Sequence, residues 1–117
     1  MAQELSREEV FVCAADLKEG ELRGQKIDGQ WIMIVNHQGK YSAMDAACAH
    51  SGYPLFKGKL NEKGVVTCSL HYAQFNCRDG KVVSDPAICG DQIMFEVVVK
   101  EGKVFWLRAK AQEPKNP

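Results

Sequence analysis

Short apolar runs separated by turn signals organise most of the chain. They are rich in β-branched and aromatic residues, and glycine-containing pairs stand before or between them. The runs occupy residues 9–14, 31–35, 41–44, 65–68, 81–83, 93–100 and 103–108. Glu101-Gly102, between the last two runs, is the clearest hairpin signal. No window has a convincing helical period, although one helical turn fits residues 14–20 and another fits residues 51–57. The pattern predicts an all-β antiparallel sandwich or barrel.

The length of 117 residues suits one domain, which we expect to span 1–117 and to be ordered over about 9–108. The polar ends, up to about Arg7 and from Ala109 onward, are expected to fray. Fifteen Lys and Arg balance fifteen Asp and Glu, so the excess positive charge that nucleic-acid binding needs is missing. No apolar run is long enough to cross a membrane, and the N-terminus lacks the apolar core of a signal peptide. We therefore expect a soluble cytoplasmic protein without nucleic-acid or membrane partners.

Five cysteines and three histidines carry the candidate chemistry. An odd number of cysteines cannot pair completely within one chain, and in a reducing compartment cysteines more often bind metal or lie buried. Two short motifs, Cys48-Ala-His50 and Cys68-Ser-Leu-His71, place cysteine beside histidine twice. Two thiolates and two imidazoles make a four-ligand metal set. A single zinc ion accepts the same four ligands, and chance proximity in the core is the other alternative.

The remaining thiols and the third histidine have simpler interpretations. Cys13 fits the core of a strand. Cys77 and Cys89 are expected to pack in the interior or to remain as thiols, with a disulfide between them as the alternative. His37 falls in a predicted turn, where we expect a solvated side chain.

The order of the ligands separates the metal alternatives. Zinc fingers pair cysteine with cysteine and histidine with histidine, whereas both pairs here are mixed. If each motif divides its ligands between two irons, one iron receives two cysteines and the other two histidines, as in a Rieske 2Fe–2S centre. The sequence resembles the Rieske family over about residues 9–108. The segments that carry the resemblance are CAHSGYPL at 48–55 followed by Gly58, CSLHYAQF at 68–75 followed by Asp79-Gly80, and SDPA at 84–87.

The resemblance implies a fold, a cofactor and a site. The fold would be a Rieske-like antiparallel β sandwich or barrel, with a small cluster-binding subdomain of two loops at about 46–77 and a proline loop at 84–87. The cofactor would be one Rieske-type 2Fe–2S cluster. Cys48 and Cys68 would bind one iron as thiolates, and His50 and His71 would bind the second, redox-active iron.

Four further positions indicate the type of Rieske protein. Proteins of the cytochrome bc type carry an extra cysteine in each arm, and the matching positions here hold Tyr53 and Leu70, so no bracing disulfide is expected. The same type places a serine and a tyrosine hydroxyl at the cluster, where this chain has Ala73 and Phe75. Fewer hydrogen bonds to the sulfurs predict a potential in the lower part of the Rieske range, which runs from about −150 to +300 mV.

Within the family that the chain resembles, these features favour an electron-carrier ferredoxin. The resemblance implies that such a carrier moves one electron from a reductase to an oxygenase or a similar acceptor. Only about nine residues follow the last predicted strand. Those residues are too few for the 2-His-1-carboxylate iron domain of an oxygenase, so we expect no enzyme activity from this chain alone. The alternatives are a tightly bound Rieske small subunit of a larger oxidoreductase and a zinc-binding structural β domain.

The two arms contain no Asp, Glu, Lys or Arg over residues 46–56 and 65–77. We expect their side chains to screen the cluster and to form an uncharged docking tip. The residues assigned to that tip are Ser51, Tyr53, Leu55, Leu70 and Tyr72. Three lysines between the arms form either a solvated face or a rim that steers partners. These are Lys57, Lys59 and Lys63.

Overall fold

The computed structural model describes residues 7–49, 52–69, 72–83 and 90–109, and the strands in that part of the chain form three antiparallel sheets. The first sheet has the order β1-β10-β9, made of Arg7–Ala14, Lys103–Ala109 and Val97–Lys100. The second has the order β2-β3-β4-β8, made of Leu22–Ile27, Gln30–His37, Lys40–Asp45 and Met94–Phe95. The third, β5-β6-β7, is made of Lys59–Leu60, Val65–Thr67 and Gln74–Asn76. The predicted all-β antiparallel fold is confirmed.

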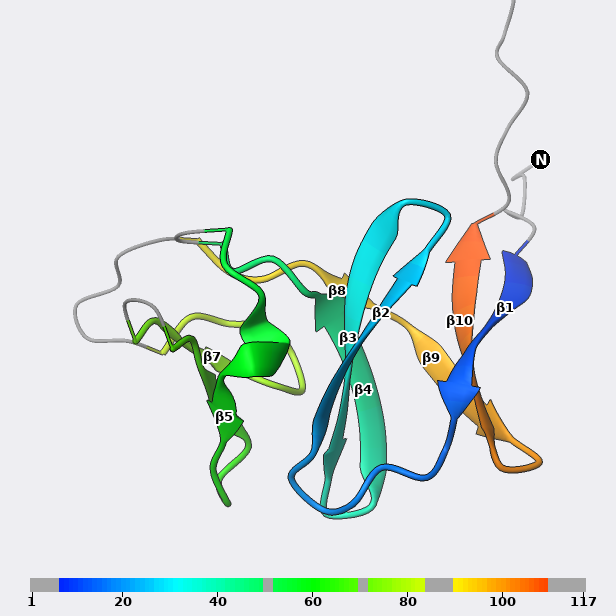
Figure 1. The fold of residues 1–117 in the computed structure, drawn as a ribbon, viewed down its shortest axis with the longest axis horizontal. Coiled ribbons are helices and arrows are strands. Elements are labelled where there is room, and N and C mark those ends of the chain that lie inside the picture. Colours follow the sequence, from blue (N-terminus) through cyan, green and yellow to red (C-terminus); the bar gives the residue numbers. More distant parts are fainter. Residues whose placement is uncertain (1–6, 50–51, 70–71, 84–89, 110–117) are drawn as a thin grey trace, which may run out of the picture.

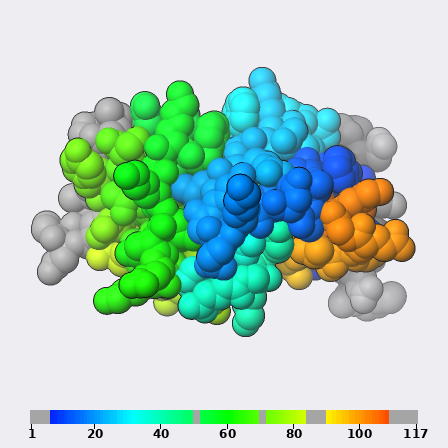
Figure 2. Space-filling model, turned by 60° about the horizontal axis from the view of Figure 1, so that its bottom comes forward, coloured from blue at the N-terminus to red at the C-terminus, as the bar shows by residue number. Residues whose placement is uncertain are grey.

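The second sheet lies between the other two. Figure 1 shows β1, β9 and β10 on one side of it and β5 and β7 on the other. A short 3-10 helix, η1 (Leu55–Lys57), lies between the third sheet and β2. In Figure 2 the segment after β4 (green), the first strands (blue and cyan) and the C-terminal hairpin (orange) lie side by side in direct contact. The molecule is therefore elongated, with its two outer sheets at opposite ends.

Strand β3 is buried on both faces, which explains why its sequence is continuously apolar from Ile32 to Val35. Ile32 and Ile34 pack in one core cluster together with Val104 of the first sheet. Met33 and Val35 pack in a second cluster together with residues of the third sheet. Because successive side chains of a strand point to opposite faces, this one strand joins the two halves of the molecule.

The predicted strand over residues 93–100 is divided between two sheets. Met94 pairs with Met44 of β4, whereas Val97 pairs with Trp106 of β10. Glu96, between the two short strands, is exposed. An apolar run does not show which sheet each half will join, because that choice depends on distant partners.

Most of the other predicted strands are confirmed with small changes at their ends. The hairpin across Glu101-Gly102 joins β9 to β10, as expected. Residues 81–83 contribute only an isolated bridge between Val82 and Phe75, so that predicted strand is wrong. The apolar pattern does not reveal β2, β5 or β7, because those strands are short or mostly polar.

The two predicted helical turns have different outcomes. Residues 14–20 contain no helix, and there the Leu17 N–H donates to the Tyr41 hydroxyl at 3.1 Å. The Leu17 carbonyl accepts from the Asn36 side-chain amide at 2.8 Å, so the segment is held as an irregular connection between β1 and β2. The second turn is confirmed over Leu55–Lys57, and Ser51 lies outside the described residues.

A close contact joins η1 to the second sheet. The Phe56 ring lies against Gly24 of β2, where an added Cβ would come within 2.3 Å of the ring. The same ring also stacks with Trp31 of β3, with 5.6 Å between ring centroids and 28° between ring planes. Glycine at position 24 is therefore required by the approach of Phe56.

Arg7 begins β1 and pairs with Ala109, so order reaches further toward both ends than expected. The other residues predicted to fray, 1–6 and 110–117, lie outside the described part of the chain. Within that part, no helix combines the length and the apolar character needed to cross a membrane.

Candidate metal centre

The first candidate loop is closed by hydrogen bonds on both sides of Cys48. The Cys48 N–H donates to the Tyr53 carbonyl at 2.9 Å, and the Cys48 carbonyl accepts from the Gly52 N–H at 2.7 Å. Next to these bonds, Ala47 and Pro54 form an isolated antiparallel bridge. The chain therefore leaves β4, turns tightly after Cys48 and runs back antiparallel to itself.

The second candidate loop is built in the same way around Cys68. The Cys68 N–H donates to the Ala73 carbonyl at 2.8 Å, and the Cys68 carbonyl accepts from the Tyr72 N–H at 2.9 Å. Next to these bonds, Thr67 at the end of β6 pairs with Gln74 at the start of β7. The loop is thus the closed end of the β6–β7 hairpin.

The two cysteines occupy equivalent positions in two matching loops. In each loop the cysteine carbonyl bonds to the N–H four residues later, and the cysteine N–H bonds to the carbonyl five residues later. The fourth residue has a positive φ in both loops, 77° at Gly52 and 63° at Tyr72. Tyr72 holds this left-handed conformation at a cost of about 1–2 kcal/mol, and its side chain is 71% exposed.

Both cysteine side chains enter the same apolar core. Cys48 is 3% exposed and Cys68 is 0% exposed, and both belong to the core cluster that contains Met33 and Val35 of β3. The two loops therefore bring residues that are far apart in the sequence to one side of the central sheet.

The cysteine half of the predicted ligand set fits a metal centre. An isolated thiolate is costly to bury, so two buried cysteines suit a cationic centre that neutralises them. The predicted ligands His50 and His71 lie outside the described residues. Without them, the described part of the chain contains no group of three or more metal-binding side chains.

Ala73 and Phe75, which follow Cys68 in the second loop and in β7, make the surroundings of its thiol apolar. Ala73 and Phe75 are fully buried in the same core cluster as Cys68. Neither side chain carries a hydroxyl that could donate a hydrogen bond to sulfur. Tyr53 is half-buried, and Leu70 lies outside the described residues.

The predicted docking tip needs one correction. Leu55 is 0% exposed and belongs to the core cluster, so it cannot form part of an exposed tip. The Leu55 N–H donates to the Ala46 carbonyl at 2.7 Å, which extends the antiparallel pairing of the first loop, and the Leu55 side chain packs in the core cluster. Tyr72 is the most exposed aromatic residue of the described tip, and Ser51 lies outside the described residues.

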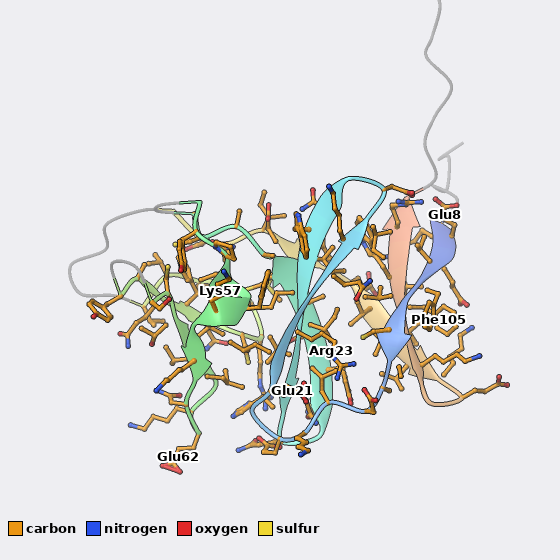
Figure 3. All side chains as sticks on the ribbon, in the orientation of Figure 1. Glu8, Glu21, Arg23, Lys57, Glu62 and Phe105 are labelled. Carbon is orange, nitrogen blue, oxygen red and sulfur yellow. The ribbon has the colours of Figure 1, made fainter. Side chains whose placement is uncertain are left out.

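The expected solvated position of His37 is wrong. Strand β3 extends to His37, which is 5% exposed because the β5–β6 turn covers it. Its Nε2 donates to the Glu62 carbonyl at 2.9 Å, and its Nδ1 accepts from the Arg78 guanidinium at 3.3 Å. Figure 3 shows Glu62 at the end of that turn. His37 is therefore a structural residue that fastens the third sheet to the second.

Of the three cysteines outside the two motifs, Cys13 and Cys77 are both buried. Cys13 is buried in the cluster that contains Val104, as expected for a strand core residue. Cys77 is fully buried beside His37, and burial raises the pKa of its thiol. Cys89 lies outside the described residues.

A surface hollow of about 300 Å³ borders the first loop. It is lined by Trp31, Ala46, Ala47, Gly52, Pro54, Phe56 and Lys57. Among the described residues of this lining, Lys57 alone is charged, and Figure 3 shows it on η1. Lys59 and Lys63 are also exposed, so all three lysines between the arms face solvent.

One buried polar residue that reaches the first loop had no signal in the sequence. Gln92 is 5% exposed, and its side-chain amide contacts the backbone of residues 45–49. It belongs to a short polar segment with no recognisable motif, so only its contacts reveal it.

Comparison with known families matches nearly the whole chain. The family described as Rieske [2Fe-2S] domain matches residues 8–105. This span contains both candidate loops and all three sheets except for the first residue of β1 and the last residues of β10.

Two sequence relatives differ in how much of their own length is matched. The ferredoxin component of an alkene monooxygenase system from Xanthobacter autotrophicus is 32% identical over 99 residues, which are 84% of this chain and 80% of that protein. Apoptosis-inducing factor 3 from Homo sapiens is 33% identical over 106 residues, which are 89% of this chain but 17% of that protein.

A solved structure matches the fold closely. It is a complex of reduced oxygenase and oxidized ferredoxin in carbazole 1,9a-dioxygenase. The matching chain superposes with a TM-score of 0.75 at 29% identity, over 83% of this chain and 99% of that chain.

Proposed function

The chain belongs to the Rieske 2Fe–2S family, and from that membership we propose how its own residues and partners make it an electron carrier. It holds one Rieske-type 2Fe–2S cluster and serves as a ferredoxin in electron transfer. When bound, the cluster supplies one-electron redox chemistry. The chain transforms no substrate itself, so it is a carrier and not an enzyme alone.

Cys48 and Cys68 supply the two thiolates, and His50 and His71 supply the two imidazoles. The observation that carries this assignment is the equivalence of the two loops, which place both cysteines at the same hydrogen-bonded position. Each loop holds its histidine in the sequence between the cysteine and the residue of positive φ. The four proposed ligands therefore come from two loops that share the same backbone hydrogen-bond pattern.

The described residues that pack around the two cysteines are mainly apolar and exclude water. The two thiols lie among apolar side chains of the core, and Ala73 and Phe75 offer no hydroxyl to the sulfurs. A reduced, more negative centre is then less stabilised, which supports a low reduction potential.

The partners are a reductase that donates the electron and an oxygenase that accepts it. The match to a ferredoxin chain solved together with an oxygenase supports this choice of acceptor. The loops have no charged side chains over residues 46–56 and 65–77, which suits a small transient contact. We place the carrier in the cytoplasm, where buried thiols such as Cys13 and Cys77 remain reduced.

Metal analysis and electron paramagnetic resonance test the cofactor and its ligands together. Purified protein is expected to contain two irons and two labile sulfides, and to give a Rieske-type spectrum after reduction with dithionite. Cys48→Ser and Cys68→Ser are expected to abolish that spectrum. Cys77→Ala, at an equally buried thiol outside the loops, is the matched control and should retain it. One zinc per chain, or loss of the spectrum in Cys77→Ala alone, would contradict the assignment.

A second candidate function is a Rieske unit that works within a larger oxidoreductase. The match to only 17% of a much longer relative favours this alternative, since the same domain occurs there as part of a longer chain. Size-exclusion chromatography of extracts from the source cell distinguishes the two. A carrier migrates by itself near 13.0 kDa, whereas a fixed subunit migrates with a catalytic chain.

A further inference from the structure

The side-chain amide of Gln92 makes three hydrogen bonds to residues 45–49, the segment that leads from the end of β4 into the first loop. Its Nε2 donates to the carbonyls of Asp45 at 2.8 Å and Ala47 at 2.7 Å. Its Oε1 accepts from the Ala49 N–H at 2.6 Å. The three bonds therefore go to the backbone of residues 45, 47 and 49, and residue 49 directly follows Cys48.

The backbone of Gln92 is held just as firmly from the other side. Its N–H donates to the Gly80 carbonyl at 2.7 Å, and the Gly80 N–H donates to the Asn76 carbonyl of β7 at 2.8 Å. Gly80 has a φ of 74°, and an added Cβ there would come within 2.5 Å of the Gln92 carbonyl oxygen. Gln92 is therefore seated on the turn that follows the hairpin carrying the second loop.

These two sets of contacts make a continuous connection between the loops. It runs from β7 through Gly80 and Gln92 to the backbone at Ala49. Because Gln92 is buried, removal of its amide would leave the carbonyls at 45 and 47 and the N–H at 49 short of partners. Ala47 would still have its own N–H bonded to the Asp45 carboxylate at 2.9 Å, so the loop would loosen without losing every contact.

We propose that Gln92 is a positioning residue for the metal centre. Its contacts fix the position of the peptide between Cys48 and Ala49 relative to the loop that carries Cys68. The proposal rests on the ligand assignment proposed above. A positioning residue acts through the ligands it orients, and loss of such supporting contacts typically lowers metal affinity by about 10- to 100-fold. Gln92 therefore affects how tightly the centre is held and the reduction potential, beyond any effect on folding.

The test compares Gln92 with another buried amide that bridges backbone far from the loops. Asn36 is 8% exposed, and its side chain donates to the Leu17 carbonyl at 2.8 Å and accepts from the Gly39 N–H at 3.0 Å. Gln92→Met keeps the length of the side chain without its hydrogen bonds, and Gln92→Glu keeps an acceptor but loses both donors. Asn36→Leu is the matched control.

Three properties are measured on each protein with its cluster bound. They are the reduction potential, the paramagnetic resonance spectrum and the rate of iron release to a chelator. Both Gln92 variants are expected to release iron about tenfold faster or more than the wild type and to show a shifted potential. Asn36→Leu is expected to lower the unfolding temperature while its potential and spectrum stay those of the wild type. Gln92→Glu also places a carboxylate against the carbonyl oxygens of residues 45 and 47, so it is expected to release iron at least as fast as Gln92→Met.

The outcomes distinguish this inference from the proposed function. A wild-type protein without a Rieske-type spectrum overturns the proposed function itself. A wild-type protein with that spectrum, combined with Gln92 variants of unchanged potential and iron release, overturns only the role of Gln92. Equal changes in Asn36→Leu also overturn it, because they would show that any buried amide has the same effect.

Discussion

At the residue scale, the two apolar side chains beside the candidate centre, Ala73 and Phe75, determine how well the extra negative charge on the sulfurs of a reduced centre is stabilised. Ala73→Ser is expected to raise the reduction potential by supplying a hydroxyl donor. One hydrogen bond contributes about 1 kcal/mol, which corresponds to about 40 mV for a one-electron couple. Protein-film voltammetry measures the shift.

The same change elsewhere controls for the effect of a buried hydroxyl. Ala43 of β4 is equally buried, but it belongs to the other core cluster with Val104. Ala43→Ser should therefore leave the potential unchanged. A potential that stays constant in Ala73→Ser would show that position 73 does not reach a cluster sulfur.

Burial of Cys77 predicts a pH dependence of stability. Burial raises the pKa of this thiol in the folded protein above its value in the unfolded chain, so the unfolded chain releases its proton first as the pH rises. The free energy of unfolding is then expected to fall above a pH of about 8.5, by at most about 1.4 kcal/mol per pH unit. Cys77→Ala should remove this part of the decline, as measured by thermal unfolding between pH 7 and pH 10. Identical pH profiles for the two proteins would contradict the prediction.

At the scale of elements, the contact between Gly24 of β2 and Phe56 of η1 fastens the first loop to the central sheet. Gly24→Ala is expected to displace the ring from Trp31 and to lower the free energy of unfolding by about 1–3 kcal/mol, the usual cost of overpacking. Denaturant unfolding and Trp fluorescence measure the two effects. Gly90→Ala is the control, since an added Cβ there meets nothing within 4 Å. Equal stability of the two variants would show that Phe56 can move aside without cost.

The element scale also shows how far local pattern reaches. Hairpins such as Glu101-Gly102 are visible in the sequence because a turn and its two strands are neighbours along the chain. The division of residues 93–100 at Glu96 is not visible, because β4 and β10 select their partners from a distance. Strand β2 escapes detection for a related reason, since it has few apolar residues and is defined by its pairing with β3.

At the scale of the whole molecule, balanced charge and uncharged loops predict a contact with little electrostatic steering. The rate of electron transfer to a basic substitute acceptor, such as cytochrome c, should change by less than about tenfold between low and high salt. Lys57→Glu places a negative charge beside the first loop and should make the dependence on salt steeper. Stopped-flow kinetics at several ionic strengths measure both, and a steep dependence in the wild type would indicate a charged docking face.

The sequence by itself determined the chemistry of this protein, because Cys48-Ala-His50 and Cys68-Ser-Leu-His71 are local patterns whose residue types limit the centres they can form. It also determined the all-β class, since period and turn signals act over a few residues. Only the tertiary structure decided the burial of His37 and Leu55 and the role of Gln92. Burial depends on which distant segment covers a side chain, and a glutamine becomes significant only when the fold places unsatisfied backbone groups around its amide.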